Sequence, residues 1–425
     1  MMREHDDRPP RLLMVATVAD MVYGFLLPFA RHFRARGWRV DALAQGFSQW
    51  PDCADAFDRV WEIGWSRRPL SPTNLLSAPK RLRSLVAAEG YDLVHVHSPI
   101  AAFVTRMALR RMRRAGTLRV IYTAHGFHFY QGGPRLRGAM YRTLEKLAGR
   151  WTDQLIVINR EDEEAVLRYG IVPADRLHYM PGIGVDTQVY SAAAVSEADI
   201  ARIRNELGLQ SNHRLFLMVA EFNPRKRHRD VLHAFARLNR PEAILALPSY
   251  GPRLDEMKRL ATSLGIADRV RFLGFRKDIP ALVQSSVATL LPSEQEGLPR
   301  TVMESMCQGV PVIASRIRGV TDLLDDGRGR MVRVGDIQGF VDAMSWVLNH
   351  PDEARQMGER GRAAIAAFDL RHIIDLHEEL YEQTLGKTPL KSWTISSCGG
   401  TPPSSSSNLS PCFQVSPQRG TEGQL

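Results

Sequence analysis

The sequence predicts an α/β protein made of two doubly wound domains that face each other across a cleft. Three observations predict this fold class. Short, continuously apolar runs alternate with helical patterns, as expected for strands buried on both faces of a parallel sheet. The alternation occurs twice along the chain, and a turn-rich segment, Met180–Gly184, separates the two series. The 425 residues, 44% of them hydrophobic, are sufficient for two packed cores.

The first series begins with a predicted strand over Leu12–Thr17 and a helix over Gly24–Arg36, which ends at Gly37. Its other predicted strands are Trp38–Ala44, Arg59–Ile63, Leu93–His97, Arg119–Ala124 and Leu155–Ile158. The predicted strands of the second series are Leu215–Ala220, Ala243–Leu247, Val270–Leu273, Val287–Leu291, Val310–Ala314 and Met331–Val334. Helical patterns lie between them over Arg229–Leu238, Arg253–Leu264, Thr301–Gln308 and Gly339–Leu348. Ligands of such sheets bind beyond the carboxyl ends of the strands, so we expect the active site in the cleft.

The composition argues against a membrane-spanning, a secreted and a disulfide- or metal-stabilised protein. No apolar run approaches the ~20 residues that span a bilayer. The first eleven residues are charged and Pro-rich, unlike a secretory signal, and the four cysteines are too far apart for a disulfide or metal framework. We therefore expect a cytoplasmic protein without a metal site. From about Thr388 the sequence becomes low-complexity, which predicts a disordered tail over 388–425.

The net charge of +10 is concentrated in one stretch. Residues 101–150 hold eleven basic residues and one acid, Glu145. Many of these cations lie on Ile100–Arg114, which also carries an apolar stripe, so we expect a helix with a cationic face. Two interpretations stay open: a solvated helix flank, or attraction to an anionic membrane surface. Nucleic acid is disfavoured, because zinc-finger, RNP-like and heptad motifs are missing from the sequence.

The segment Pro292–Gly309 carries the most informative pattern. Glu296 and Glu304 are eight positions apart, on either side of a predicted helix start. Free N–H groups at such a start attract an anion, and the carboxylates beside it can accept hydrogen bonds from sugar and ribose hydroxyls. The segment therefore indicates a nucleotide-sugar site, with a pair of surface acids as the alternative.

Three further segments lie at predicted strand ends. Arg225, Lys226 and Arg227 place three cations where they can neutralise a pyrophosphate, unless they form a solvated turn. The loop within Phe272–Ile279 can offer backbone edges to a base. His125, in YTAHGFHFY, can reach a bound phosphate or sugar, although a lone histidine is more often structural.

Taken together, these segments resemble the glycosyltransferase family 4 (group 1) enzymes of the GT-B fold, over about residues 11–385. The first-domain phrases YDLVHVHSP, YTAHGFHFY and PGIGVDTQVY look most like the subgroup that builds bacterial capsule, exopolysaccharide or lipid-linked oligosaccharide. The resemblance implies an acceptor-side Rossmann-like domain over 1–185 and a nucleotide-sugar-binding one over 186–370. A helix over 371–387 would cross back onto the first domain.

The resemblance also implies roles for individual residues. Glu296 would bind donor-sugar hydroxyls, Lys226 the donor diphosphate, and His125 the donor sugar and phosphate. The other donor-binding residues that it implies are Gly24, Arg225, Arg276, Lys277, Gly297, Leu298 and Glu304. The sequence departs from the family in two places: Glu221 stands where many members have Arg, so that Arg225 or Arg227 would substitute, and only one glycine, Gly24, follows the first strand.

The implied reaction is metal-independent transfer of a sugar, with retention, from a nucleotide diphosphate, by resemblance UDP. A lipid-linked or polysaccharide acceptor would receive it, without any cofactor, at the cytoplasmic face of the membrane. The alternatives are a GT-B epimerase, a transferase with a soluble acceptor, and a catalytically silent nucleotide-sugar-binding subunit. An oxidoreductase is disfavoured, because no G-x-G-x-x-G follows the first strand.

Overall fold

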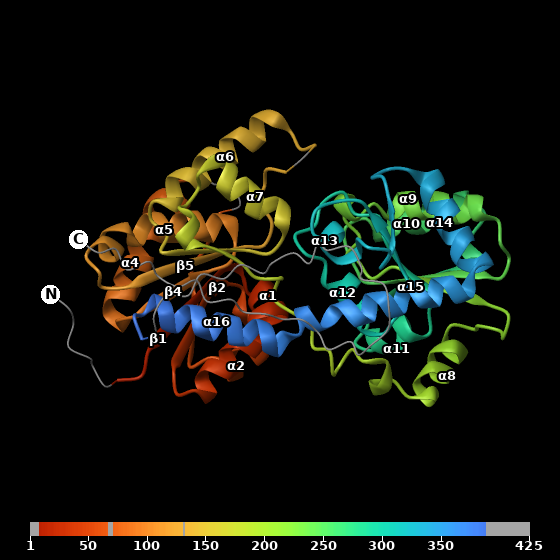
Figure 1. Ribbon diagram of the computed structural model, residues 1–425, viewed down its shortest axis with the longest axis horizontal. Coiled ribbons are helices and arrows are strands. Elements are labelled where there is room, and N and C mark those ends of the chain that lie inside the picture. Colours follow the sequence, from red (N-terminus) through yellow and green to blue (C-terminus); the bar gives the residue numbers. More distant parts are fainter. Residues whose placement is uncertain (1–7, 67–70, 131, 388–425) are drawn as a thin grey trace, which may run out of the picture. The chain divides into compact units, whose positions relative to one another are not determined.

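The computed structural model describes residues 8–66, 71–130 and 132–387. Within them the chain forms two parallel β-sheets with helices on their faces (Figure 1). The tail over 388–425, predicted to be disordered, lies outside the described residues. None of the described helices combines the length and the apolar character that a membrane span requires.

The first sheet has seven strands in the order β3-β2-β1-β4-β5-β6-β7, paired in parallel throughout. These strands are β1 (Arg11–Val18), β2 (Arg39–Gln45), β3 (Arg59–Glu62), β4 (Leu93–Val96), β5 (Arg119–Ala124), β6 (Gln154–Val157) and β7 (Leu177–Tyr179). The second sheet has six parallel strands in the order β10-β9-β8-β11-β12-β13. These are β8 (Arg214–Leu217), β9 (Ala243–Pro248), β10 (Val270–Gly274), β11 (Ala288–Leu291), β12 (Val312–Ser315) and β13 (Arg330–Val332). The predicted fold of two doubly wound domains is confirmed.

Helices connect the strands of each sheet. In the first part of the chain they are α1 (Ala19–Met21), α2 (Leu27–Ala35), α3 (Asp52–Ala56), α4 (Ala78–Glu89), α5 (Pro99–Arg114), α6 (Arg135–Gly149) and α7 (Arg160–Tyr169). They continue with α8 (Glu197–Glu206), α9 (His228–Leu238), α10 (Leu254–Ser263), α11 (Ile279–Gln284), α12 (Arg300–Cys307), α13 (Val320–Leu324), α14 (Ile337–Asn349), α15 (Pro351–Ala364) and α16 (Leu370–Thr384). The predicted strands and helices are present with shifted ends, and β7 was not predicted. The domain boundaries at residues 185, 370 and 387 stay predictions.

The strands of the first sheet are apolar throughout because cores cover both of its faces. Along β1, Leu13 and Val15 pack into one core, together with residues of α4 and α5. Leu12 and Met14 point to the opposite face and pack into a second core. Side chains alternate between the faces of a strand, so a strand covered on both sides is apolar at every position.

Helix α16 returns to the first sheet, as predicted for the cross-over helix. Its residues Ile373 and Tyr381 belong to the same core as Leu12 on β1. The ring of His377 meets Phe29 edge-on, and Tyr381 stacks on Phe33, both on α2. Figure 1 shows α16 beside α2 and β1.

Gly24, at which the predicted helix starts, lies inside a helical segment. A short π-helix, Val22–Leu26, lies between α1 and α2 and contains this glycine. A methyl group on Gly24 would meet no atom within 4 Å, so the backbone requires no glycine at this position. The helix predicted from Gly24 onwards therefore begins five residues earlier, at Ala19.

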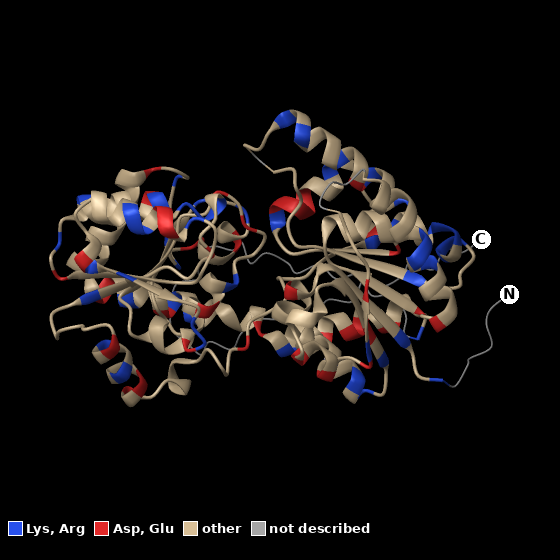
Figure 2. Ribbon diagram, turned by 180° about the vertical axis from the view of Figure 1, so that it is seen from behind, with Lys and Arg blue, Asp and Glu red and all other residues tan. Residues whose placement is uncertain are grey.

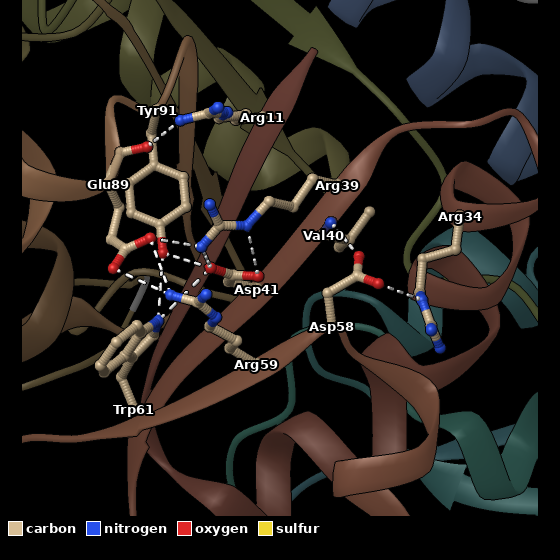
Figure 3. Close-up of polar contacts among 10 residues, drawn as sticks. All are labelled: Arg11, Arg34, Arg39, Val40, Asp41, Asp58, Arg59, Trp61, Glu89 and Tyr91. Atoms are coloured by element: carbon tan, nitrogen blue, oxygen red, sulfur yellow. Dashed lines mark hydrogen bonds and ion pairs between the residues drawn. The ribbon is translucent and has the colours of Figure 1, made fainter. Parts of the chain in front are cut away.

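The charged residues at the start of β2 form a network around one buried carboxylate (Figure 3). Asp41 is fully buried and lies 2.7 Å from Arg39 Nη2, and it accepts a hydrogen bond of 2.6 Å from Tyr91 Oη. Arg39 also contacts Glu89, whose pKa it lowers. The first residues of β1, β2 and β3 meet at this edge, opposite the carboxyl ends where ligands bind, so the network stabilises the fold.

Helix α5 is present as predicted, but one of its cations does not face solvent. The Arg106 side chain is 1% exposed and lies 2.8 Å from Glu145 Oε2 on α6. Its guanidinium also lies 4.1 Å from the ring centre of Tyr122. Arg106 is therefore buried in the first core and is not part of the cationic face predicted for this helix, and it pairs with the single acid of the basic stretch.

Candidate functional site

The centre of the predicted site is an ion pair between two loops of the second sheet. Lys226 Nζ donates to Glu296 Oε1 at 2.6 Å. Lys226 follows β8 and Glu296 follows β11, and these neighbouring strands place both loops at the same carboxyl edge. Both side chains are partly exposed, so the pair is open to a ligand. The structure thus brings together two of the three residues predicted to be catalytic.

The loop of Lys226 is shaped by its neighbours. The Asn223 side chain caps a short 3₁₀-helix, Pro224–Lys226, and accepts a hydrogen bond of 3.2 Å from the Lys226 amide. Arg227 adopts a left-handed backbone conformation with φ of 53°, and its side chain binds Asp230 at 2.6 Å. This contact turns Arg227 towards α9.

Arg225 is better placed than Arg227 to supply the cation that Glu221 cannot. Its side chain is exposed and, in the described part of the chain, has no hydrogen-bonding or ionic partner, whereas Arg227 is committed to Asp230. Its carbonyl accepts a hydrogen bond of 3.0 Å from the Glu294 amide, which ties the loop of Lys226 to that of Glu296. The substitution stays a prediction, with Arg225 as the better candidate.

Glu304 lies on α12, eight positions after Glu296, but its carboxylate is buried. Arg300 Nε lies 2.9 Å from Glu304 Oε1, and the Tyr190 side chain hydrogen-bonds the same carboxylate. Burial raises the pKa of Glu304, while Arg300 opposes the shift. Arg300 Nη1 also donates to the Gly24 carbonyl at 2.9 Å. Arg300 therefore connects two predicted donor-binding residues, a role that its place at the helix start did not reveal.

The backbone around Gly297 packs tightly against that of His125. A methyl group on Gly297 would lie 2.1 Å from the His125 carbonyl oxygen, so a larger residue does not fit. A methyl group on Gly319 would in turn lie 1.9 Å from the Gly297 carbonyl oxygen. The third predicted catalytic residue, His125, therefore adjoins the loop of Glu296 through backbone contact. The neighbouring Leu298 packs against Gly182.

His125 is half-buried and adjoins a group of buried imidazoles, those of His95, His97 and His377. Its Nε2 lies 3.2 Å from His97 Nδ1, and the rings of His97 and His95 are 4.0 Å apart. Burial lowers the pKa of His125 to about 4, and His377 contributes in the same direction. The imidazole of His125 is therefore neutral at pH 7 and can hydrogen-bond a hydroxyl or a phosphate oxygen without a charge of its own.

Sequence reasoning missed Arg318, which is buried behind the loop of Glu296. Its guanidinium donates to the Glu296 carbonyl at 3.1 Å and to the Phe127 carbonyl at 2.6 Å. It also pairs with Asp162 at 2.8 Å. Burial raises the pKa of Asp162 to about 6, and Arg318 opposes this shift, so the carboxyl is ionised at pH 7. An arginine shortly after a predicted strand gave no signal of these partners.

The loop after β10 carries Arg276 and Lys277, whose predicted contact with the base is mainly through their backbone and stays a prediction. The Arg276 side chain is occupied by ion pairs with Glu206 and Asp278, so its guanidinium is not free to contact a base. Lys277 is exposed. Two exposed aromatic rings, Tyr250 after β9 and Phe275 after β10, lie 6.3 Å apart and offer a face on which a base could stack.

A cavity of about 820 Å³ lies beside the loop of Glu296. Its lining includes Glu294, Gln295, Arg318, Tyr130 and Arg160, while Lys226, Glu296 and Glu304 lie outside it. Among the described residues, no three His, Cys, Asp or Glu side chains are grouped as metal ligands. The arrangement can bind an anion through Lys226 and Arg225, and hydroxyl groups through Glu296.

Comparison with known proteins gives the family. The family model "Glycosyl transferases group 1" matches residues 199–364, and the model "Glycosyl transferase 4-like domain" matches residues 25–182. A glycosyltransferase of Bacillus subtilis (strain 168), EpsD, is 31% identical over 375 residues, which cover 87% of this chain and 96% of EpsD. The chain belongs to the group 1 glycosyl transferases.

Other relatives agree with this assignment. An Escherichia coli enzyme, UDP-Gal:α-D-GlcNAc-diphosphoundecaprenol α-1,3-galactosyltransferase, is 29% identical over 269 residues, or 62% of this chain and 68% of that enzyme. The crystal structure of Anabaena HepE with UDP and glucose has a TM-score of 0.74 at 20% identity, covering 88% of this chain and 100% of HepE. Sucrose-phosphate synthase from Thermosynechococcus elongatus also gives 0.74, at 21% identity, over 89% of this chain and 100% of that one. The fold is therefore the GT-B fold of this glycosyl transferase group.

Proposed function

We propose that this glycosyltransferase moves a hexosyl or N-acetylhexosaminyl unit from UDP to a lipid-linked or growing polysaccharide acceptor, in the assembly of capsule, exopolysaccharide or O-antigen. The pair of Lys226 and Glu296 at the carboxyl edge of the second sheet carries the proposal. The name of the galactosyltransferase that acts on a diphosphoundecaprenol-linked sugar supports the lipid-linked acceptor class. UDP in the HepE crystal structure supports the nucleotide.

In the proposed reaction, Lys226 and Arg225 bind the donor diphosphate, and the N-terminal end of α12 adds its helix dipole. Glu296 accepts hydrogen bonds from sugar hydroxyls, and neutral His125 approaches the sugar from the first sheet. The bond from the anomeric carbon to the diphosphate breaks, and the acceptor oxygen bonds to the same face, so the configuration is retained. The acceptor proton passes to the leaving phosphate, and protein cations stabilise the charge without a metal or a cofactor.

The donor-site assignment is tested by Lys226→Ala and Glu296→Ala, each of which should abolish transfer while the far-ultraviolet circular dichroism stays unchanged. Lys258→Ala and Glu353→Ala are matched controls, because both residues are exposed and far along the chain from these loops. A panel of nucleotide sugars is incubated with a bacterial membrane lipid extract, and products are read by mass spectrometry. Full transfer by either site variant would overturn the assignment.

The same experiment separates the alternatives. An epimerase would change the nucleotide sugar without added lipid, and a transferase with a soluble acceptor would give no lipid product. A silent subunit would bind UDP in calorimetry and turn over no donor. We place the enzyme at the cytoplasmic face of the membrane, where lipid-linked acceptors are presented.

A further inference from the structure

Helix α6 presents an apolar stripe to solvent. Leu136 is 90% exposed, Met140 46% and Leu147 40%. Together with the exposed Thr143 they occupy positions i, i+4, i+7 and i+11. At about 100° per residue these four positions fall within an arc of about 60°, so they form one continuous outer face.

Cations flank this stripe on both sides. By the same helical geometry, Arg135 and Lys146 lie about 90–110° to one side of the centre of the stripe and Arg137 about 90° to the other. All three are exposed, and Figure 2 shows blue segments along α6. A helix with an apolar face between two cationic flanks is typical of helices that lie in a membrane interface.

The opposite face of α6 anchors the helix to the protein. Glu145 and Ala148 are buried there, and Glu145 pairs with Arg106 on α5. Because Glu145 is the single acid of α6, its burial leaves the exposed surface of the helix without a negative side chain. The single acid of α6 therefore faces the core, and its apolar stripe and flanking cations face outwards.

Helix α5 does not offer such a face. Its apolar residues Ala101, Val104, Ala108 and Leu109 belong to the first core, and Arg106 is buried with them. Arg113 Nη1 donates to the Arg150 carbonyl at 3.2 Å, so the C-terminal ends of α5 and α6 adjoin. The exposed cations Arg111 and Arg114 can then add to the charge at that end but cannot insert apolar groups.

We propose that α6 docks the enzyme on an anionic lipid bilayer, with Leu136, Met140 and Leu147 inserted below the headgroups and the flanking cations against lipid phosphates. This proposal rests on the proposed function, because an enzyme whose acceptor is lipid-linked has to reach that acceptor at a bilayer. Charge complementarity selects this occupant: the exposed charges of α6 are positive and the bilayer surface is negative.

The test is co-sedimentation with vesicles of phosphatidylcholine alone or with 30 mol% phosphatidylglycerol. The triple variant Leu136→Ser/Met140→Ser/Leu147→Ser should lower partitioning to the anionic vesicles at least tenfold. Arg135→Gln/Arg137→Gln/Lys146→Gln should lower it to a similar extent and weaken its salt dependence, since Arg111 and Arg114 remain. Leu167→Ser is the matched control, because this leucine is 53% exposed on α7 but stands among the acids Glu163 and Glu164.

Each outcome decides the proposal. Wild-type partitioning by the triple variant, or no partitioning by the wild type, would overturn it. A dimer in sedimentation velocity that disappears in the triple variant would assign the stripe to a second copy of the chain instead. UDP binding measured by calorimetry separates this result from the proposed function: α6 variants should bind UDP as the wild type does, whereas failure of the wild type to bind UDP would refute the donor site and leave the vesicle result standing.

Discussion

Removing the carboxylate of Asp162 should destabilise the protein strongly, because it leaves a buried guanidinium without its counter-charge. The side chains of Asp162 and Arg318 are 1% and 3% exposed, and their Oδ1 and Nη1 atoms are 2.8 Å apart. The same carboxylate accepts hydrogen bonds from the Phe127 amide at 3.1 Å and from Asn159 Nδ2 at 2.9 Å. Breaking a buried pair by removing one partner costs about 3–5 kcal/mol. We expect Asp162→Ala to lower the free energy of unfolding by that amount.

The next residue on α7 supplies the control. Glu163 Oε2 lies 2.6 Å from Arg160 Nη1, but the two side chains are 23% and 42% exposed. Exposed helix pairs of this kind contribute only about 0.3–0.5 kcal/mol, so Glu163→Ala should be nearly neutral. Urea unfolding at pH 7.5, followed by circular dichroism, measures both variants. A loss below about 1 kcal/mol for Asp162→Ala would refute the inference that this variant leaves the Arg318 guanidinium buried without a counter-charge.

Three further substitutions test other parts of the structure. His377→Phe should make the free energy of unfolding depend less steeply on pH below about 6.5. Burial lowers the pKa of His377 to about 4, so the unfolded chain binds more protons than the folded one between about pH 6.5 and 4. The wild-type histidine therefore costs ~1.4 kcal/mol of stability for each unit by which the pH falls through this range. Urea unfolding between pH 7 and 4.5 measures the slope, and an unchanged slope would contradict the assignment. Asp41→Ala should lower the unfolding free energy by about 3 kcal/mol and leave UDP affinity in calorimetry unchanged, because Asp41 lies at the edge opposite the site; a loss of affinity would count against this. Gly297→Ala should abolish transfer, because its methyl group would lie 2.1 Å from the His125 carbonyl oxygen. The methyl group of Gly24→Ala would meet no atom within 4 Å, so this variant should keep the fold. Equal activity of the two variants would be inconsistent with this packing.

The sequence was sufficient to predict the strands because burial on both faces leaves an unbroken apolar run. Leu12 and Leu13 point to opposite cores, yet both had to be apolar. Strand β7 was not predicted because it is three residues long and has the sequence Leu-His-Tyr, in which His178 Nε2 lies 2.8 Å from Gln154 Oε1. The hydrogen bond that makes His178 acceptable in a strand is a tertiary contact, and no local pattern contains it.

Local sequence also predicted which loops carry the candidate site, because the carboxyl ends of parallel strands meet at one edge. Lys226 and Glu296, 70 positions apart, were expected together and form a hydrogen bond. Side-chain partners were less predictable. The guanidinium of Arg276 pairs with Glu206, 70 positions earlier, and Arg106, one of the cations on the helix with the predicted cationic face, pairs with Glu145 inside the core. Charge along the chain gives the sum of charges and does not show which of them cancel in the fold.

The side-chain partners around His125 were not predictable from local sequence either. They include residues of α16, so this helix contributes to the site as well as to the fold. Burial raises the pKa of Tyr381, so its hydroxyl stays protonated, and it lies at hydrogen-bond distance, 2.5 Å, from His95 Nδ1. The other ring nitrogen, His95 Nε2, lies 2.8 Å from Thr123 Oγ1. The ring of His95 lies beside that of His97 at an angle of 40°, and His97 hydrogen-bonds His125. A tyrosine 286 positions away thus hydrogen-bonds the ring next to the partner of His125, so the returning helix forms part of the surroundings of the predicted catalytic imidazole.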